Sequence, residues 1–409
     1  MTMPHGFDPN RLERVGETIK TRYVDAGVIP GALTLIWRRG AVAHLSMSGF
    51  IDMERKIAMR EDAIFRIYSM TKPITSVAFL MLLEEGKVAL DDPVHRYIPG
   101  FENLRVFTGG DLASGFLTAS SARPMKIIDL MRHTSGLTYG FLDRTNVDAA
   151  YTKLGVAEFY TEGGLAAMIA QLEKLPLEFS SGDAWNYSVA TDVLGYLVEK
   201  IAGENFADFV RRRILVPLGM RDTDFHVPAE KRGRFASCYY VKAGRMLLYD
   251  DGQNSTYAAP PKLESGGGGL AGTAADYLRF CRMMLGGGAL DGVRLLSPKT
   301  VGLMTMNHLP QAKEITQMMP NTATFSESGY AGVGFGLGVA VTVNLAHAAL
   351  PGTVGEYAWG GAAATYFFCD PKEDLAVIFM TQILAAPERI RLRRDLRSLV
   401  YGAMAESFA

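Results

Sequence analysis

Residues 65–86 have the sequence FRIYSMTKPITSVAFLMLLEEG, in which a serine and a lysine stand three apart at the start of an apolar run. Pro73 is tolerated only in the first turn of a helix, so a helix is expected to begin near residues 69–72. Residues three apart on a helix share one face, so the Lys72 amine can reach the Ser69 hydroxyl. The first turn also offers unpaired N–H groups and the positive end of the helix dipole, which suit a nucleophile at Ser69.

This serine and lysine allow two interpretations. A serine hydroxyl is a poor nucleophile at neutral pH and needs a neighbouring base, which a lysine or a tyrosine of lowered pKa can supply. Serine is also a common helix N-cap, and the S-x-x-K pattern often occurs by chance. The pair alone therefore leaves a catalytic and a structural role open.

The bulk composition is that of a globular chain with no electrostatic preference for nucleic acid. Its 409 residues allow roughly two to three domains, and 48% hydrophobic content supports a sizeable core. The net charge is −1, from 42 basic and 43 acidic residues, so we expect no nucleic-acid partner. Cys238, Cys281 and Cys369 lack the spacing of a disulfide framework or a zinc site, and we expect reduced, mostly buried thiols.

The sequence contains no recognisable targeting, membrane or metal signal. The start, MTMPHGFDPNRLERVGETIK, lacks an apolar signal core, and the longest apolar run, residues 77–83, is too short to cross a bilayer. The seven histidines show no ligand spacing such as H-E-x-x-H. We therefore expect a cytoplasmic protein with no membrane span, no metal and no cofactor.

Hydrophobic periodicity divides the chain into strand-rich ends and a helical middle. Near the start, helical spacing over residues 12–27 precedes strand patterns at 32–37 and 41–46. Near the end, two strand-like stretches surround DPKED, which is typical of a hairpin turn, and a last helix is predicted at 387–401. Between these ends helical periodicity dominates, at residues 165–175, 189–201 and 206–215.

Strands at both ends with helices between them predict two domains. We assign residues 1–85 and 290–409 to a discontinuous α/β domain, and residues 86–289 to an inserted, mostly helical domain. Pockets favour seams between domains, so the active site is expected where the two meet.

Five short blocks occur in a characteristic order: SMTKP (69–73), LMRHTSGL (130–137), WNYS with DVLGYL (185–197), ESGGGGLAGTAADYLRF (264–280) and WGG (359–361). Together they resemble the serine β-lactamase and penicillin-binding protein superfamily, in particular its class C β-lactamases and family VIII carboxylesterases. The resemblance extends over about residues 12–400. It implies a β-lactamase-like fold of the α/β + α class, with an antiparallel sheet flanked by helices.

The resemblance also implies catalytic roles for three residues. Ser69 corresponds to the acylated nucleophile, Lys72 to its activating partner, and Tyr187 to the general base and later proton donor. A free tyrosine titrates near about pH 10, so it acts as a base only beside a cation, for which Lys72 is the candidate. Which of Lys72 and Tyr187 accepts the proton stays open, and we treat them as one coupled unit.

Two departures from the class C pattern favour a neutral ester over a β-lactam. The Y-x-N block is here Tyr187, Ser188 and Val189, so its amide is missing. The K-T-G block corresponds to Trp359, Gly360 and Gly361. Replacing that lysine by an indole removes a cation that would pair with the carboxylate of a β-lactam or of a D-alanyl-D-alanine end.

The same block is expected to line the substrate site. Gly360 and Gly361 let a strand lie close to the substrate, and the resemblance places the oxyanion donors at the N–H groups of Ser69 and Ala362. Trp359 is expected to contact the substrate, although an aromatic residue in a strand is more often part of the core.

Two other features have a structural interpretation. GGGLAG, residues 267–272, fits a dinucleotide-binding pattern, but the prolines of the preceding YAAPPKLES exclude the buried strand that such a site needs. We expect these glycines to form a loop beside the active-site cleft. His133 has no task in a lysine and tyrosine scheme and is expected to be a hydrogen-bonded structural residue.

The sequence thus predicts an enzyme, a carboxylesterase that cleaves small, short-chain esters through an acyl-enzyme on Ser69. Within the enzyme class the alternatives are an acyltransferase, or a weak β-lactamase, D-amino-acid peptidase or amide hydrolase. The alternative from another class is a non-catalytic binding module, which would require none of Ser69, Lys72 and Tyr187. The sequence makes no prediction of oligomeric state.

Overall fold

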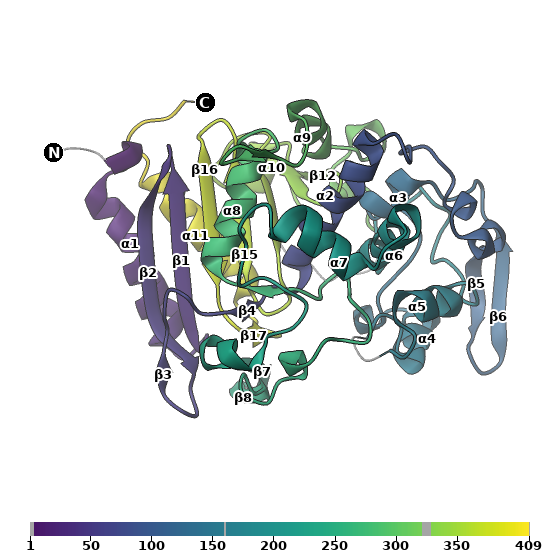
Figure 1. Ribbon diagram of the computed structural model, residues 1–409, viewed down its shortest axis with the longest axis horizontal. Coiled ribbons are helices and arrows are strands. Elements are labelled where there is room, and N and C mark those ends of the chain that lie inside the picture. Colours follow the sequence, from purple (N-terminus) through teal and green to yellow (C-terminus); the bar gives the residue numbers. More distant parts are fainter. Residues whose placement is uncertain (1–3, 159–160, 321–328, 409) are drawn as a thin grey trace.

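Strands from both ends of the chain meet in one eight-stranded antiparallel sheet (Figure 1). The computed structural model describes residues 4–158, 161–320 and 329–408. β1 (Gly31–Arg38) pairs with β16 (Leu375–Met380), so the two ends share a core. The sheet order is β12-β13-β14-β15-β16-β1-β2-β3. Its other strands are β2 (Ala41–Asp52), β3 (Ile57–Ala58), β12 (Val333–Phe335), β13 (Ala340–Thr342), β14 (Tyr357–Gly360) and β15 (Tyr366–Asp370).

Alternate side chains of the central strands enter two different helical layers. On β1, Ile36 faces α1 (Pro9–Ile19) and α11 (Arg389–Gly402), whereas Leu33 belongs to the core on the other face. That second face is covered by α8 (Ala274–Leu285), which packs against β1, β15 and β16. Successive side chains of a strand point to opposite faces, which explains why all eight residues of β1 are buried.

The helix expected after Ser69 is α2 (Thr71–Glu84), which lies between the sheet and the helices beyond it (Figure 1). A 3-10 turn, Tyr68–Met70, precedes it, so the helix starts where Pro73 requires. α2 packs against α6 (Ala190–Ala202) and α7 (Phe206–Val210) and is buried almost throughout. The other helices are α3 (Ile127–Met131), α4 (Asn146–Leu154), α5 (Gly164–Leu172), α9 (Pro298–Met304) and α10 (Leu345–Ala348).

Two hairpins lie in the part of the chain where the sequence predicted helices. One joins β5 (Arg105–Asp111) to β6 (Gly115–Ser120), and the other joins β7 (Cys238–Lys242) to β8 (Arg245–Asp250). No residue of β5, β6 or β8 is buried, and their sequences, RVFTGGD, GFLTAS and RMLLYD, do not alternate regularly between apolar and polar residues as a half-buried strand does. β17 (Ile383–Leu384) pairs in parallel with β7 and ties the second hairpin to the C-terminal part of the chain.

Two helices pack across the predicted boundaries between domains. α2 was assigned to the α/β domain and contacts α6 and α7, whereas α8 was assigned to the helical domain and contacts the sheet. The division into residues 1–85 with 290–409 and residues 86–289 therefore stays a prediction. The remaining short strands are β4 (Phe65–Arg66), β9 (Ala271–Gly272), β10 (Ala289–Leu290) and β11 (Val293–Arg294).

Candidate active site

Ser69 lies in the tight turn that leads into α2, with 8% of its surface exposed. The preceding residue, Tyr68, has a φ of 43°, in the left-handed region that side chains other than glycine rarely adopt. Such a strained backbone persists only where the surrounding structure holds it in place. The turn therefore needs a rigid support on its N-terminal side.

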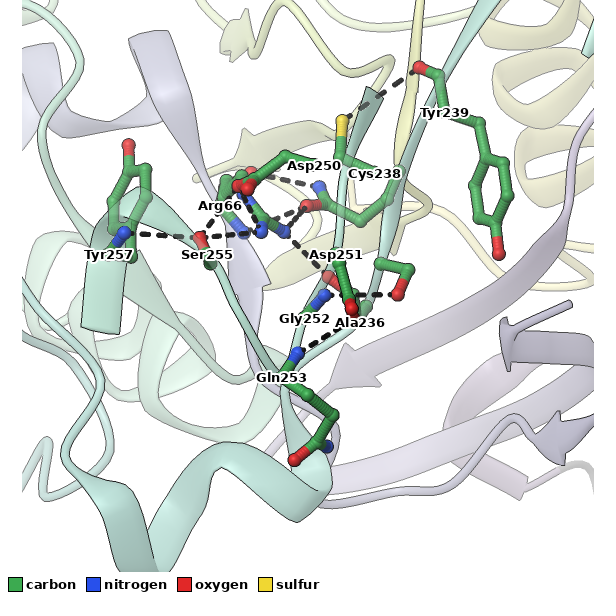
Figure 2. Close-up of polar contacts among 12 residues, drawn as sticks. Arg66, Ala236, Cys238, Tyr239, Asp250, Asp251, Gly252, Gln253, Ser255 and Tyr257 are labelled. Carbon is green, nitrogen blue, oxygen red and sulfur yellow. Dashed lines mark hydrogen bonds and ion pairs between the residues drawn. The ribbon is translucent and has the colours of Figure 1, made fainter. Parts of the chain in front are cut away.

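Arg66, on β4, lies two residues before Tyr68 and is held by several buried polar contacts (Figure 2). Its buried guanidinium contacts the Asp250 carboxylate through Nε, at 2.8 Å, and through Nη2. Nη1 donates to the Ala236 carbonyl at 2.6 Å and to Gln382 Oε1 at 3.2 Å, and Nη2 donates to Ser255 Oγ at 3.0 Å. Every guanidinium N–H thus has an acceptor, as a buried charge requires.

The structure brings Ser69, Lys72 and Tyr187 together, as the sequence predicted. The hydroxyl oxygens of Tyr187 and Ser69 lie 2.5 Å apart, within hydrogen-bond distance, and Lys72 Nζ lies 3.3 Å from the same Ser69 oxygen. Lys72 Nζ also lies 4.5 Å from the centre of the Tyr187 ring. All three side chains are buried, so electrostatic interactions among them are stronger than in water. The arrangement can deprotonate Ser69 and make it a nucleophile.

The Tyr187 side chain is held by aromatic neighbours. Its ring lies 5.1 Å from that of His133 and 5.5 Å from that of Trp359, centre to centre. His133 is buried, and its Nδ1 lies 3.2 Å from Ser188 Oγ. Burial, and then the charge of Lys72, hold the pKa of His133 well below its usual range, so the imidazole is neutral. These are the contacts of a structural histidine, as expected.

Tyr139 and Gly267 complete the surroundings of Lys72, and the sequence analysis assigned neither a role. Lys72 Nζ donates to the Tyr139 hydroxyl at 3.0 Å and to the Gly267 carbonyl at 2.7 Å. The Tyr139 ring stacks on Phe141, which is 58% exposed. Tyr139 follows the HTSGL block by two residues, and that proximity was the available signal.

The glycine loop predicted beside the cleft does contact the site. A Cβ atom at Gly267 would overlap Asp192 Oδ2 and would come within 2.8 Å of the Tyr139 hydroxyl. Only glycine therefore lets the main chain approach Lys72 this closely. The pattern that resembled a dinucleotide site has this packing explanation.

The predicted oxyanion donors, the N–H groups of Ser69 and Ala362, belong to two segments that pack against each other. Gly361 packs tightly on the nucleophile's turn, because a Cβ there would lie 2.5 Å from the Ile67 carbonyl oxygen. Arg393 holds this loop by donating to the carbonyls of Gly361 and Thr365, at 3.3 and 2.8 Å. The loop can therefore present an N–H to a developing oxyanion.

Trp359 lies behind Tyr187, with 1% of its surface exposed. Its ring packs edge-on against Phe335 at 5.3 Å. The adjacent Gly360 has no room for a Cβ beneath the Arg393 guanidinium. Direct contact of Trp359, Gly360 and Gly361 with a substrate stays a prediction, and for Trp359 it requires Tyr187 or its neighbours to move.

Cys238, Cys281 and Cys369 are all buried, as expected, and none of the three is joined to another in a disulfide. Within the described ranges, no group of three or more histidine, cysteine, aspartate or glutamate side chains is placed to hold a metal ion. In the same ranges no helix combines the length and apolar character needed to cross a membrane.

Comparison with known proteins finds relatives over most of the chain. The family described as Beta-lactamase matches residues 17–401. Protein Rv1367c of Mycobacterium tuberculosis (strain H37Rv) is 37% identical over 363 residues, covering 88% of this chain and 87% of the relative. Esterase EstB of Burkholderia gladioli is 31% identical over 389 residues, covering 91% of each chain.

A solved structure shares the fold over nearly the whole chain. EstCE1, described as a hydrolase with promiscuous acyltransferase activity, superposes with a TM-score of 0.78 and 27% sequence identity. The match covers 96% of this chain and 99% of that one. The predicted β-lactamase-like fold, an antiparallel sheet flanked by helices, is thereby confirmed.

Proposed function

The chain belongs to the Beta-lactamase family, and from this we propose that it is a carboxylesterase of the family VIII type that forms an acyl-enzyme on Ser69. An esterase at 31% identity and a hydrolase of the same fold support the coarser description, a serine enzyme of ester hydrolysis or acyl transfer. The observation that carries the proposal is the contact of Tyr187 Oη and Lys72 Nζ with one buried serine oxygen.

In the proposed mechanism, Tyr187 and Lys72 act as one unit that removes the Ser69 proton. Ser69 Oγ then attacks the ester carbonyl, and the N–H groups of Ser69 and Ala362 stabilise the oxyanion. The proton passes from Tyr187 to the departing alcohol. Water, activated by the same unit, attacks the acyl-enzyme and releases the acid, after which Ser69 regains its proton.

The proposed substrate class rests on two departures from the class C sequence pattern. Trp359 stands where a cationic lysine would otherwise pair with a substrate carboxylate. Val189 stands where the class C pattern has an amide. A small, neutral, short-chain ester is therefore the proposed substrate, used without cofactor or metal, in a cytoplasmic enzyme without a nucleic-acid partner.

Acyl transfer is the second candidate function. The hydrolase at 27% identity is described as having promiscuous acyltransferase activity, and the chemistry differs only in an alcohol replacing water. A weak β-lactamase, D-amino-acid peptidase or amide hydrolase would use the same acyl-enzyme. A non-catalytic binding module would not need the contacts among Ser69, Lys72 and Tyr187.

The test is a turnover panel with p-nitrophenyl acetate and butyrate, each with and without a primary alcohol, and with nitrocefin. Ser69→Ala is compared with Ser76→Ala, a control on α2 whose buried Oγ has no hydrogen-bond partner among the described residues. We expect ester hydrolysis in wild type and Ser76→Ala, its loss in Ser69→Ala, and little nitrocefin turnover. An acyl product that forms mainly on the alcohol would favour the transferase, and equal turnover in Ser69→Ala would refute the proposal.

A further inference from the structure

Asp192 is a buried carboxylate on the first turn of α6, to which the proposed mechanism assigns no task. Its Oδ1 accepts hydrogen bonds from the Ser265 hydroxyl and, at 3.0 Å, from the Gly267 N–H. Its Oδ2 has no hydrogen-bond partner among the described residues. A buried carboxylate oxygen without a donor is costly unless a positive charge lies nearby.

Gly267 connects this carboxylate to Lys72. The Gly267 N–H donates to Asp192, and its carbonyl accepts from Lys72 Nζ at 2.7 Å. A side chain at position 267 would overlap Asp192 Oδ2. One glycine therefore lies between a buried carboxylate and a buried amine, and the absence of a Cβ keeps the two close.

The charge of Lys72 acts on Asp192 across Gly267. Burial, the largest effect, leaves the pKa of Asp192 above its usual value, and the charge of Lys72 is the largest influence that lowers it. The positive end of the α6 dipole also favours the ionised carboxylate. The titratable neighbours of Lys72 among the described residues include the phenols of Tyr139 and Tyr187 and the imidazole of His133, which is neutral.

We propose that Asp192 is a positioning residue that keeps Lys72 protonated, so that Tyr187, as a phenolate beside that cation, accepts the Ser69 proton. The inference rests on the proposed esterase function and deepens it, because it assigns the two members of the coupled unit. The proton leaves Ser69 Oγ for Tyr187 Oη and then moves to the departing alcohol oxygen, while the Lys72 ammonium keeps its protons.

The test measures how fast a fluorophosphonate probe modifies Ser69 as a function of pH, followed by intact mass, so that it does not depend on ester turnover. In wild type, reactivity is expected to fall at alkaline pH where Lys72 loses its proton. Asp192→Asn removes the charge and keeps the size of the side chain. The alkaline limb of the pH profile, where reactivity falls, should therefore shift to lower pH by about one unit or more. Ser265→Ala keeps the charge and loses only a hydrogen bond, so its limb should stay in place.

Different results would overturn different conclusions. An Asp192→Asn limb that coincides with that of wild type, with only a uniform fall in rate, would make Asp192 merely structural. A wild type whose Ser69 is not modified at any pH would refute the esterase proposal and this inference together. If Ser69 is modified in wild type but the alkaline limb of the Asp192→Asn profile does not move, only the inference about Asp192 is refuted.

Lys72→Met gives the reciprocal test and leaves Asp192 in place, should Asp192→Asn fail to fold. Without the cation, less opposes the burial that raises the pKa of Asp192, so this carboxyl should take up a proton more readily than in wild type. Infrared spectra of protein labelled with ¹³C-aspartate should then show a buried, protonated carboxyl band in Lys72→Met that is absent from wild type. Identical spectra would overturn the proposal.

Discussion

Arg66 and Lys72 are two buried cations six residues apart, and they are held in opposite ways. Arg66 contacts the Asp250 carboxylate directly, and the rest of its guanidinium is engaged by Ala236, Gln382 and Ser255. Lys72 instead contacts the oxygen that is to react, on Ser69, and faces the Asp192 carboxylate across a glycine.

The difference suggests a structural role for Arg66 and a catalytic role for Lys72 within one short segment. A guanidinium has a pKa too high to lose its proton and a fixed fork of donors, which suits Arg66 to a structural role in the segment before Ser69. An ammonium is a compact point charge on a flexible stem, so Lys72 can bring its charge to the atoms between which the proton moves. Changes at the first cation should therefore cost stability, and changes at the second should cost activity.

The largest expected effect is on activity, at Tyr187. Tyr187→Phe removes the proton acceptor, so kcat/KM for p-nitrophenyl butyrate should fall by roughly 10²–10⁴-fold. The melting temperature should change little, because the ring contacts with His133 and Trp359 remain.

The matched control is Tyr23→Phe, since the Tyr23 phenol is also buried and donates to Asp395 on the far side of the sheet. That variant should lose about 1–3 kcal/mol of stability and keep its kcat/KM. Equal activity losses in the two variants would contradict the separation between support and chemistry.

The next largest effect is expected on stability, at the Asp250 carboxylate that contacts Arg66. Asp250→Ala leaves the buried Arg66 without its carboxylate, which should cost about 3–5 kcal/mol in the free energy of unfolding. Urea unfolding measures this loss, and Asp250→Asn, which retains an acceptor, should cost less. A stable Asp250→Ala protein with strongly reduced kcat/KM would show that this cluster acts on the chemistry instead.

A third effect is the response to acid. Burial is the largest influence on Asp129 and raises its pKa, but the hydrogen bonds and charge of Arg123 and the Lys126 N–H outweigh it and lower the pKa below its usual value. A carboxyl whose pKa is lower in the folded state stabilises the protein above its unfolded pKa, and the benefit is lost as pH falls below about 4.

Asp129→Asn should therefore reduce stability at pH 7 by about 1–3 kcal/mol and flatten the fall in melting temperature between pH 5 and about pH 3. Thermal unfolding across this range measures both. An acid profile that keeps its wild-type slope in the variant would exclude Asp129 as a source of the acid sensitivity.

The smallest expected effect concerns Cys238, close to Arg66, whose thiol should not react in the native protein. Burial raises the pKa of Cys238 to about 11, so almost no thiolate exists at neutral pH. An aromatic disulfide reagent should label Cys238 only after denaturant is added. Fast labelling of the native protein at pH 8 would show that the region around Arg66 opens more readily than its contacts indicate.

Much of the fold could be predicted because its signals are local. The apolar pattern after Ser69, the position of Pro73 and the DPKED turn each specify one element, and the structure contains all of them. The hairpins β5–β6 and β7–β8 could not be predicted, because β5, β6 and β8 have no buried residue and β7 has only two, Cys238 and Tyr239.

The site was partly predictable for a similar reason. Ser69 and Lys72 are neighbours in sequence, and Tyr187 could be placed by the resemblance. Tyr139 and Asp192 come from other segments, and their roles depend on main-chain contacts through Gly267, which no residue pattern specifies.

The central claim is that Ser69 alone is acylated, and trapping the acyl-enzyme tests it most directly. Wild type, Ser69→Ala and Ser76→Ala would be mixed with p-nitrophenyl butyrate, quenched in acid during the burst, and examined by intact mass and peptide mapping. The account predicts one butyryl group on the peptide containing Ser69 in wild type and Ser76→Ala, and none in Ser69→Ala. An adduct that persists in Ser69→Ala, or ester turnover in wild type without any adduct, would contradict it.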